Sequence, residues 1–155
     1  MKISDLVDRD AATCRAQDDL RVAAWTMQRA ACRSLPVIDR LGRVVGILTE
    51  RDVRLAVTIL DRAPGAITAG EACGERPDHR FQVDLEGSTV LAAMRKRSLH
   101  DAVIVDRDGR FVGVVTLDDL TAALRVDIDD PGRALDTALA GKRGPAAAFI
   151  EAATW

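Results

Sequence analysis

The sequence predicts an α+β fold in which one β-α-β-β-α unit occurs twice. The main observation is an internal repeat, because residues 42–53 return as residues 109–120, an offset of 67 positions. A repeat of this length indicates two copies of one supersecondary unit. A second observation is that strand-like and helix-like periodicities follow the same order in both copies. The identical pairs are Asp39/Asp106, Arg40/Arg107, Gly42/Gly109, Arg43/Arg110, Val45/Val112, Gly46/Gly113, Thr49/Thr116 and Asp52/Asp119.

In the first copy, residues 11–15 predict a short strand, and residues 18–31 predict an amphipathic helix that begins with two aspartates. Two short runs rich in β-branched residues, 35–39 and 44–48, predict a β-hairpin around a glycine-containing turn. A second amphipathic helix is expected to begin at Thr49. These four predictions give the β-α-β-β-α order.

The second copy repeats this order in a looser form. It predicts a strand near 81–84, a helix over 90–97, strands at 102–106 and 110–115, and a helix from Leu117. Its first helix is expected to be about two residues shorter than the helix of the first copy, with Gly87 near its start.

Four segments follow from these patterns: a first repeat at 1–61, a linker at 62–79, a second repeat at 80–126 and a helical C-terminal tail at 127–155. The linker is rich in proline and glycine and is expected to hold one helical turn. The tail is expected to pack on the body of the protein or on a dimer mate; the alternative is a segment that docks a partner.

Composition excludes several classes of protein. The chain of 155 residues is 48% hydrophobic and 3% aromatic, which predicts a globular fold with an aliphatic core. Lys and Arg (22) nearly balance Asp and Glu (24), so the net charge of −2 gives no general attraction to nucleic acid or anionic membranes. No apolar run reaches the ~18–20 residues of a membrane span, and no basic-then-apolar leader begins the sequence, so a cytoplasmic location is expected.

Three cysteines, Cys14, Cys32 and Cys73, are odd in number and widely spaced. With only two histidines beside them, they predict neither a disulfide framework nor a zinc site. There is also no glycine-rich phosphate loop and no Ser/His/Asp arrangement that the repeat explains. We therefore expect a protein that is not an enzyme and requires no cofactor.

The doubled pattern resembles a tandem pair of cystathionine β-synthase (CBS) domains, or Bateman module, over residues 2–125. The resemblance is carried by residues 35–39, 42–49 and 52 in the first copy and by 103–106, 109, 113–116 and 119 in the second. The chain is also similar to stand-alone bacterial two-CBS proteins, including hypoxic-response types, whose linker contains a run that resembles residues 68–71. The resemblance implies a sandwich-like packing of two three-stranded sheets about a pseudo-twofold axis. It also implies two clefts for adenine nucleotides or related ligands.

The resemblance points to particular ligand-binding residues. Thr49 and Thr116 supply a hydroxyl, and Asp52 and Asp119 supply a carboxylate that can accept hydrogen bonds from a ribose beside a helix N-terminus. The same Thr-x-x-Asp spacing forms a capping box, so these four residues either cap a helix only or also contact a ligand. A basic residue at the strand entry is expected to contact phosphate, or else to be solvated surface. These two basic residues are Arg33 and His100.

The walls for an adenine ring are expected to come from Ala12, Thr13 and Pro36 in one cleft and from Gln82, Val83 and Val103 in the other. The number of occupied clefts stays open, from none to two. The leading hypothesis is a regulatory module that binds AMP, ADP or ATP and signals by a conformational or dimerisation change. The alternative is a ligand-free interaction protein that regulates a partner enzyme or transporter. A homodimer is expected, whereas membrane and nucleic-acid partners are not.

Overall fold

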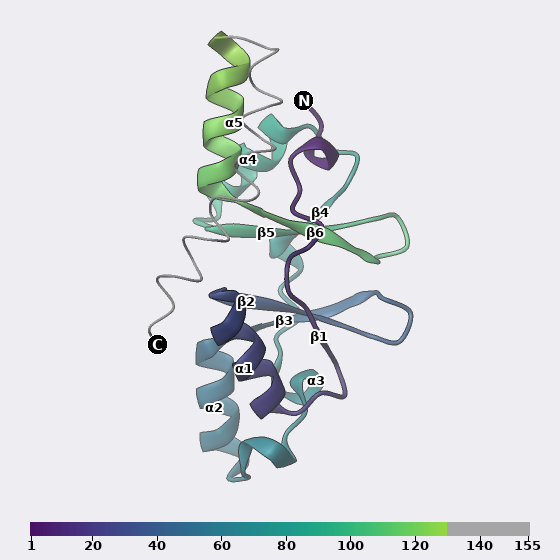
Figure 1. Cartoon of the computed structure of the whole chain (residues 1–155), viewed down its shortest axis with the longest axis vertical. Helices are drawn as coiled ribbons and strands as arrows, with labels where there is room; N and C mark the ends of the chain where they lie inside the picture. Colours follow the sequence, from purple (N-terminus) through teal and green to yellow (C-terminus); the bar gives the residue numbers. More distant parts are fainter. Residues whose placement is uncertain (130–155) are drawn as a thin grey trace. The chain divides into compact units, whose positions relative to one another are not determined.

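The computed structural model describes residues 1–129, which fall into two compact units (Figure 1). The first-copy unit is Ala12–Arg76. The second-copy unit combines Met1–Ala11 with the described residues from Pro77 onward. None of the helices in this part of the chain has the length and apolar character needed to cross a membrane.

The first-copy unit is a three-stranded sheet with its two long helices on one face (Figure 1). The strand order is β1-β2-β3, with β1 parallel to β2 and β2 antiparallel to β3. Asp19 caps the first helix, because its side chain accepts hydrogen bonds from the backbone of Arg21 and Val22. The elements are β1 (Cys14–Arg15), α1 (Leu20–Ala30), β2 (Ser34–Ile38), β3 (Val44–Thr49), α2 (Glu50–Leu60) and the single turn α3 (Ala69–Ala72).

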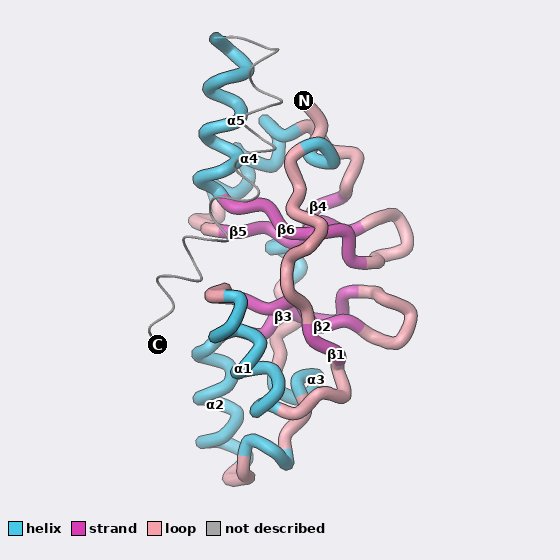
Figure 2. The backbone as a smooth tube through the Cα atoms, in the orientation of Figure 1, coloured by secondary structure: helices cyan, strands magenta, loops and turns pink. Residues whose placement is uncertain are grey.

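The second-copy unit repeats this topology, with sheet order β4-β5-β6 and the same strand directions. Figure 2 shows β4, β5 and β6 in magenta and the helices α4 and α5 in cyan. The predicted β-α-β-β-α order is therefore confirmed in both copies. Helix α4 has 10 residues and α1 has 11, so the first helix of the second copy is shorter by one residue rather than by two. The elements are β4 (Arg80–Gln82), α4 (Gly87–Lys96), β5 (Asp101–Val105), β6 (Phe111–Thr116) and α5 (Leu117–Asp129). The rest of the predicted tail, residues 130–155, lies outside the described residues.

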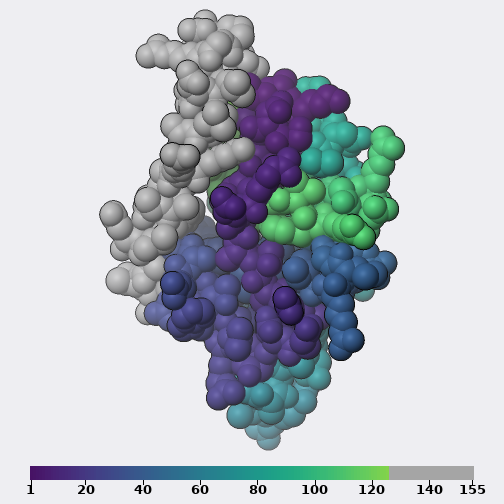
Figure 3. All heavy atoms as spheres, turned by 45° about the vertical axis from the view of Figure 1, so that its right-hand side comes forward, coloured from purple at the N-terminus to yellow at the C-terminus, as the bar shows by residue number. Residues whose placement is uncertain are grey.

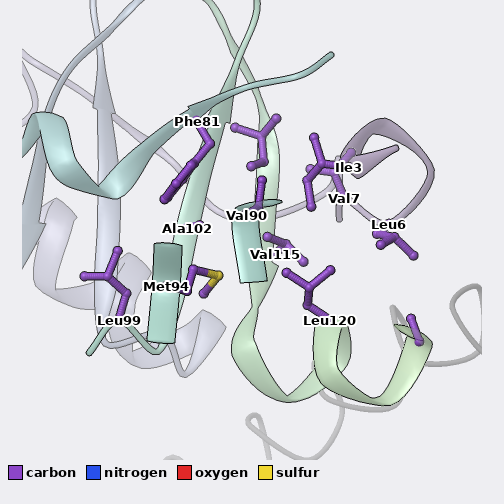
Figure 4. Packing of buried hydrophobic residues seen from close by; sticks show 12 residues of the cluster. Ile3, Leu6, Val7, Phe81, Val90, Met94, Leu99, Ala102, Val115 and Leu120 are labelled. Atoms are coloured by element: carbon purple, nitrogen blue, oxygen red, sulfur yellow. The ribbon is translucent and has the colours of Figure 1, made fainter. Parts of the chain in front are cut away.

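The first eleven residues fold with the second copy, although the repeat boundaries place them with the first. Ile3, Leu6 and Val7 are buried in one hydrophobic cluster with residues such as Val90 and Leu120 (Figure 4). In Figure 3 these N-terminal residues, in purple, lie against the green residues of the second copy. Burial of three large aliphatic side chains gives this short segment a reason to stay on the second-copy sheet.

The same place in the first-copy unit is filled by the predicted linker. Asp8 forms an antiparallel bridge with Val114 of β6, and Gly74 forms the equivalent bridge with Ile47 of β3. The segment that precedes each copy along the sequence therefore covers a strand of the other copy. The linker is an ordered part of the first-copy unit as far as Arg76.

The close approach of the covering segments explains why glycine is repeated at positions 46 and 113. A β-carbon on Gly46 would stand 2.8 Å from the carbonyl oxygen of Gly74, and one on Gly113 would stand 2.8 Å from the carbonyl carbon of Asp8. Real β-carbons do not approach backbone atoms so closely. Glycine at these two positions lets the covering segment cross the strand.

Candidate functional site

The repeated Thr-x-x-Asp sequence lies where the last strand of each copy leads into a helix. At the first junction, β3 to α2, the Thr49 hydroxyl accepts a hydrogen bond from Asp52 N at 3.1 Å. The Asp52 Oδ2 atom accepts one from Thr49 N at 2.8 Å, which completes a capping box. The capping role considered from the sequence is therefore present here, and it binds the carboxylate to its own helix terminus.

The second junction, β6 to α5, has the same residues but only half of this arrangement. The Thr116 hydroxyl accepts a hydrogen bond from Asp119 N at 3.2 Å. No return bond from Thr116 N to the Asp119 carboxylate is found among the described residues. Asp119 is thus less engaged with its own helix than Asp52 is.

Strand pairing brings the predicted basic residues to these junctions. Ser34 pairs with Thr49 and Asp101 pairs with Thr116, so Arg33 and His100 each stand one residue before a paired position. The His100 carbonyl oxygen also accepts a hydrogen bond from Leu117 N, the first residue of α5, at 2.8 Å. Both basic side chains are exposed. Each copy therefore places a basic residue, a hydroxyl and a carboxylate at one edge of its sheet.

The wall residues expected for the first copy lie at the start of its sheet. Cys14 pairs with Val37 in parallel register, so Ala12 and Thr13 approach the sheet just before β1. Pro36 is buried in β2 and pairs with Ile47. The three predicted residues therefore occupy neighbouring positions of one unit.

Register separates the wall residues expected for the second copy. Val103 is buried and pairs with Arg80, whereas Gln82 pairs with Val105 at the far end of β4. Phe81 pairs with Ile104 as Cys14 pairs with Val37. The residues that correspond to Thr13 and Ala12 are consequently Arg80 and His79, rather than Gln82 and Val83. The 67-residue offset of the repeat also assigns these two residues, but the sequence interpretation placed the strand at 81–84.

The two carboxylates differ most in their surroundings. Arg76 donates to Asp52 from both guanidinium nitrogens, at 2.7 Å to Oδ2 and 3.1 Å to Oδ1. Its Nη1 atom also donates to the carbonyl oxygen of Ile47 at 2.7 Å. Burial would raise the pKa of Asp52, but the hydrogen bonds from Arg76 and Thr49 outweigh it and hold that pKa below its ordinary value. This shift favours the ionised form of Asp52, and both of its carboxylate oxygens already accept hydrogen bonds.

Asp119 has the opposite balance. Burial raises its pKa above the ordinary value, the Thr116 hydrogen bond opposes this, and the negative charges of Asp118 and Asp8 raise it further. In the part of the chain that the structure describes, no Lys or Arg side chain pairs with it. The Asp119 carboxylate retains acceptor capacity for a hydroxyl or amino group.

Arg76 was not identified from the sequence. It lies near the end of the predicted linker, and no motif or periodicity marks it. The described residues contain no group of three or more His, Cys, Asp or Glu side chains with the spacing of a metal site. The chemistry available at the junctions is hydrogen bonding by carboxylates, hydroxyls and helix N-terminal N–H groups.

Comparison with known proteins gives a consistent result. The sequence profile of the CBS domain matches residues 3–58 and 87–126. The chain is 29% identical over 140 residues to inosine-5′-monophosphate dehydrogenase of Mycobacterium tuberculosis, covering 88% of this chain and 25% of that protein. It is 32% identical over 121 residues to the uncharacterized protein YlbB of Bacillus subtilis, covering 77% of this chain and 80% of that protein. The chain thus spans about a quarter of the length of the dehydrogenases that it matches.

Three solved structures share the fold. Hypoxic Response Protein I, solved with two coordinated zinc ions, has a TM-score of 0.67 and 21% identity over 78% of this chain and 97% of that one. The CBS domain pair of MJ0100, in complex with 5′-methylthioadenosine and S-adenosyl-L-methionine, has a TM-score of 0.65 and 22% identity over 81% and 97%. CBSX2 in complex with AMP has a TM-score of 0.68 and 17% identity over 81% and 98%. At these identities the likeness concerns the fold.

Proposed function

This chain belongs to the CBS domain family and carries two copies of the domain, and from this premise we propose that it is a regulatory module for an adenosine-containing ligand. The ligand class is AMP, ADP, ATP or a related adenosine compound. Two proteins of the same fold were solved with such ligands, MJ0100 with 5′-methylthioadenosine and S-adenosyl-L-methionine, and CBSX2 with AMP. The family and these two precedents favour adenosine over other nucleosides.

One observation in this chain carries the proposal. Asp119 stands at a helix N-terminus beside Thr116, and its carboxylate can accept further hydrogen bonds. His100 directly precedes Asp101, the strand partner of Thr116. A ribose presents hydroxyl donors to such a carboxylate, and a phosphate would suit the adjacent N–H groups and the side chain of His100. This is the only role we assign to the junction beyond capping.

We assign no reaction to the protein. Each repeated carboxylate stands at the start of a helix in its own copy, a position that the capping role explains. The dehydrogenases match over a quarter of their length, so their reaction is not carried over. The proposed output is a shift between conformations or association states, and its size equals the difference in ligand affinity between those states.

A thermal unfolding panel tests the proposal. Purified protein is heated with AMP, ADP, ATP, S-adenosylmethionine and, as the control, GMP. A ligand at 100 times its Kd stabilises the folded protein by about 2.7 kcal/mol, which gives a shift of several degrees. A shift with at least one adenosine compound and none with GMP supports the proposal. Silence of every adenosine compound at millimolar concentration would falsify it.

A second candidate function rests on the exposed apolar side chains of α1 and α2, which are together called the α1/α2 face. Trp25 on α1 is 58% exposed and Ile59 on α2 is 72% exposed, with Val22, Leu55 and Leu60 also exposed. The described residues of the second copy contain no large hydrophobic side chain with comparable exposure. We propose that this face pairs with the same face of a second chain, since an isologous contact between two apolar patches closes as a dimer.

Light scattering during size-exclusion chromatography tests the dimer. Trp25→Glu and Ile59→Glu, alone and together, are expected to convert a dimer into a monomer without unfolding it. Leu41→Glu is the matched control, because Leu41 is 60% exposed on the β2–β3 turn and lies outside this face. A wild-type chain that elutes as a monomer at 100 μM would overturn the homodimer and leave the adenosine proposal intact.

A further inference from the structure

The two junctions have the same Thr-x-x-Asp sequence, yet they differ in what occupies the carboxylate. Asp52 accepts from Arg76 at both oxygens and from Thr49 N. Its side chain is 15% exposed and that of Arg76 is 29% exposed, so the ion pair is shielded from solvent. A ligand hydroxyl that approached Asp52 would have to displace the bidentate, charge-assisted hydrogen bonds from Arg76.

Arg76, which occupies Asp52, comes from the segment that covers β3. The segment that covers β6 has a residue of opposite charge at the equivalent position. Gly74 bridges Ile47 as Asp8 bridges Val114, so the position two residues later is Arg76 in one unit and Asp10 in the other. Asp10 is exposed, and its backbone N–H donates to the Asp8 side chain. One covering segment therefore supplies a cation to Asp52, whereas the other brings the negative charge of Asp8, which raises the pKa of Asp119.

We infer that the two junctions have different roles: Asp119 in the second copy contacts the ligand, and Arg76 closes the first-copy junction by occupying Asp52. This inference rests on the adenosine-binding function proposed above and adds the stoichiometry and the residue that sets it. The chain then takes one ligand that depends on Asp119, and Arg76 is the residue that determines which copy binds. The capping box at Asp52 is a structural element of the first copy.

The same reasoning specifies the part of the ligand that is recognised. When it is ionised, the Asp119 carboxylate accepts hydrogen bonds and cannot donate them. Asp8 and Asp118 add negative charge around it. The group that meets Asp119 must be a neutral or cationic donor, which fits the ribose hydroxyls of a nucleoside and excludes a phosphate at that point. AMP is therefore expected to bind at least tenfold more tightly than 2′,3′-dideoxy-AMP.

Isothermal titration of the full chain with AMP, ATP and S-adenosylmethionine tests the inference. The wild type is expected to bind one ligand per chain. Asp119→Asn is expected to weaken binding by about ten- to a hundredfold, the range for a lost hydrogen bond to a charged group. Asp52→Asn is expected to change Kd by less than about twofold. Asp118→Asn, an exposed neighbour with the same change of charge, is the control for general electrostatics.

A second variant keeps the test independent of any unfolding in Asp52→Asn. Asp10→Arg places a guanidinium where the second copy has a carboxylate, and it is expected to pair with Asp119 and abolish binding as Asp119→Asn does. Asp5→Arg has the same change of charge in the same exposed segment and is expected to bind normally. Arg76→Ala is expected to add a second, weaker binding event, because it frees Asp52.

The outcomes separate this inference from the function on which it rests. One site that is lost in Asp119→Asn and Asp10→Arg but kept in the two controls supports it. Two equal sites in the wild type, or loss of binding in Asp52→Asn with Asp119→Asn unaffected, overturn the assignment of roles while the adenosine proposal stands. If AMP, ATP and S-adenosylmethionine all fail to bind at millimolar concentration, the inference falls together with the proposed function.

Discussion

Arg76 and Asp52 form a bidentate ion pair that ties the end of the connecting segment to the start of α2. The guanidinium also donates to the carbonyl oxygen of Ile47, so one side chain joins the connector, β3 and α2. This contact makes Asp52 a structural residue, and the equivalent Asp119 has no such partner in the described part of the chain. Substitutions at the two aspartates should therefore have different consequences for stability.

Asp52→Asn is expected to lower the free energy of unfolding by about 1–3 kcal/mol, because it leaves the half-buried guanidinium of Arg76 without its charged acceptor. Asp119→Asn removes a partly desolvated charge without breaking an ion pair, and it is expected to be neutral or slightly stabilising. Urea denaturation at pH 7 measures both. An equal loss of stability in the two variants would contradict the difference between the junctions.

The pH dependence of these two variants should also differ in sign. The pKa of Asp52 is lowered in the folded state, so its contribution is present above about pH 4, the ordinary value, and is lost as the pH falls through the folded pKa. The pKa of Asp119 is raised, so its ionisation costs stability, and this cost is complete once the pH has risen through the folded pKa.

The destabilisation by Asp52→Asn should consequently shrink when unfolding is measured at pH 3 instead of pH 7. Any gain in Asp119→Asn should also shrink, since the wild-type carboxyl is then protonated in both states. The pH-dependent part of each stability difference is about 1 kcal/mol or less, because both groups are partly exposed to solvent. Urea midpoints measured from pH 3 to pH 7 provide the test, and a pH-independent difference between wild type and Asp52→Asn would argue against an ionised pair.

Packing of the N-terminal segment gives a prediction for the core of the second copy. Ile3 is fully buried in the cluster with Val90 and Leu120. Ile3→Ala is expected to destabilise this unit by about 2–5 kcal/mol, the cost of removing a buried aliphatic side chain. Lys2→Ala, at the exposed neighbouring position, should change stability by less than about 0.5 kcal/mol. Equal urea midpoints for the two variants would show that the segment does not hold the second copy together.

The repeated glycines offer a matched pair for the covering segments. Gly113→Ala would bring a β-carbon to 2.6 Å from Val7 Cγ2 and 2.8 Å from the Asp8 carbonyl carbon, so it is expected to cost about 1–3 kcal/mol or more. Gly109→Ala meets no atom within 4 Å, but its φ of +77° is unfavourable for alanine and should cost about 1 kcal/mol. Thermal unfolding of both variants tests the order, and a milder effect at Gly113 would contradict the close approach.

The repeat, its two sheets and its main helices were predictable because each depends on local periodicity and turn chemistry. Gly42 and Gly109, for example, have φ values of +79° and +77° in the hairpin turns that the sequence predicts. The exchange of covering segments was not predictable. A run as short as Ile3–Asp5 carries no periodicity, and its partners lie far along the chain. For the same reason the ion pair of Arg76 with Asp52 has no signature in the sequence.

Cys14 provides a last prediction, on thiol reactivity. Burial, together with the charge of Asp18 and the neighbouring thiols of Cys73 and Cys32, raises the pKa of the Cys14 thiol to about 12. At pH 8 only about one thiol in ten thousand is then ionised, and the side chain is also inaccessible. Iodoacetamide labelling followed by peptide mass spectrometry should leave Cys14 unmodified in the folded protein and modify it fully in urea. Labelling of folded Cys14 as fast as that of half-buried Cys73 would show that β1 opens readily and that the edge of the first-copy sheet is less stable than its packing implies.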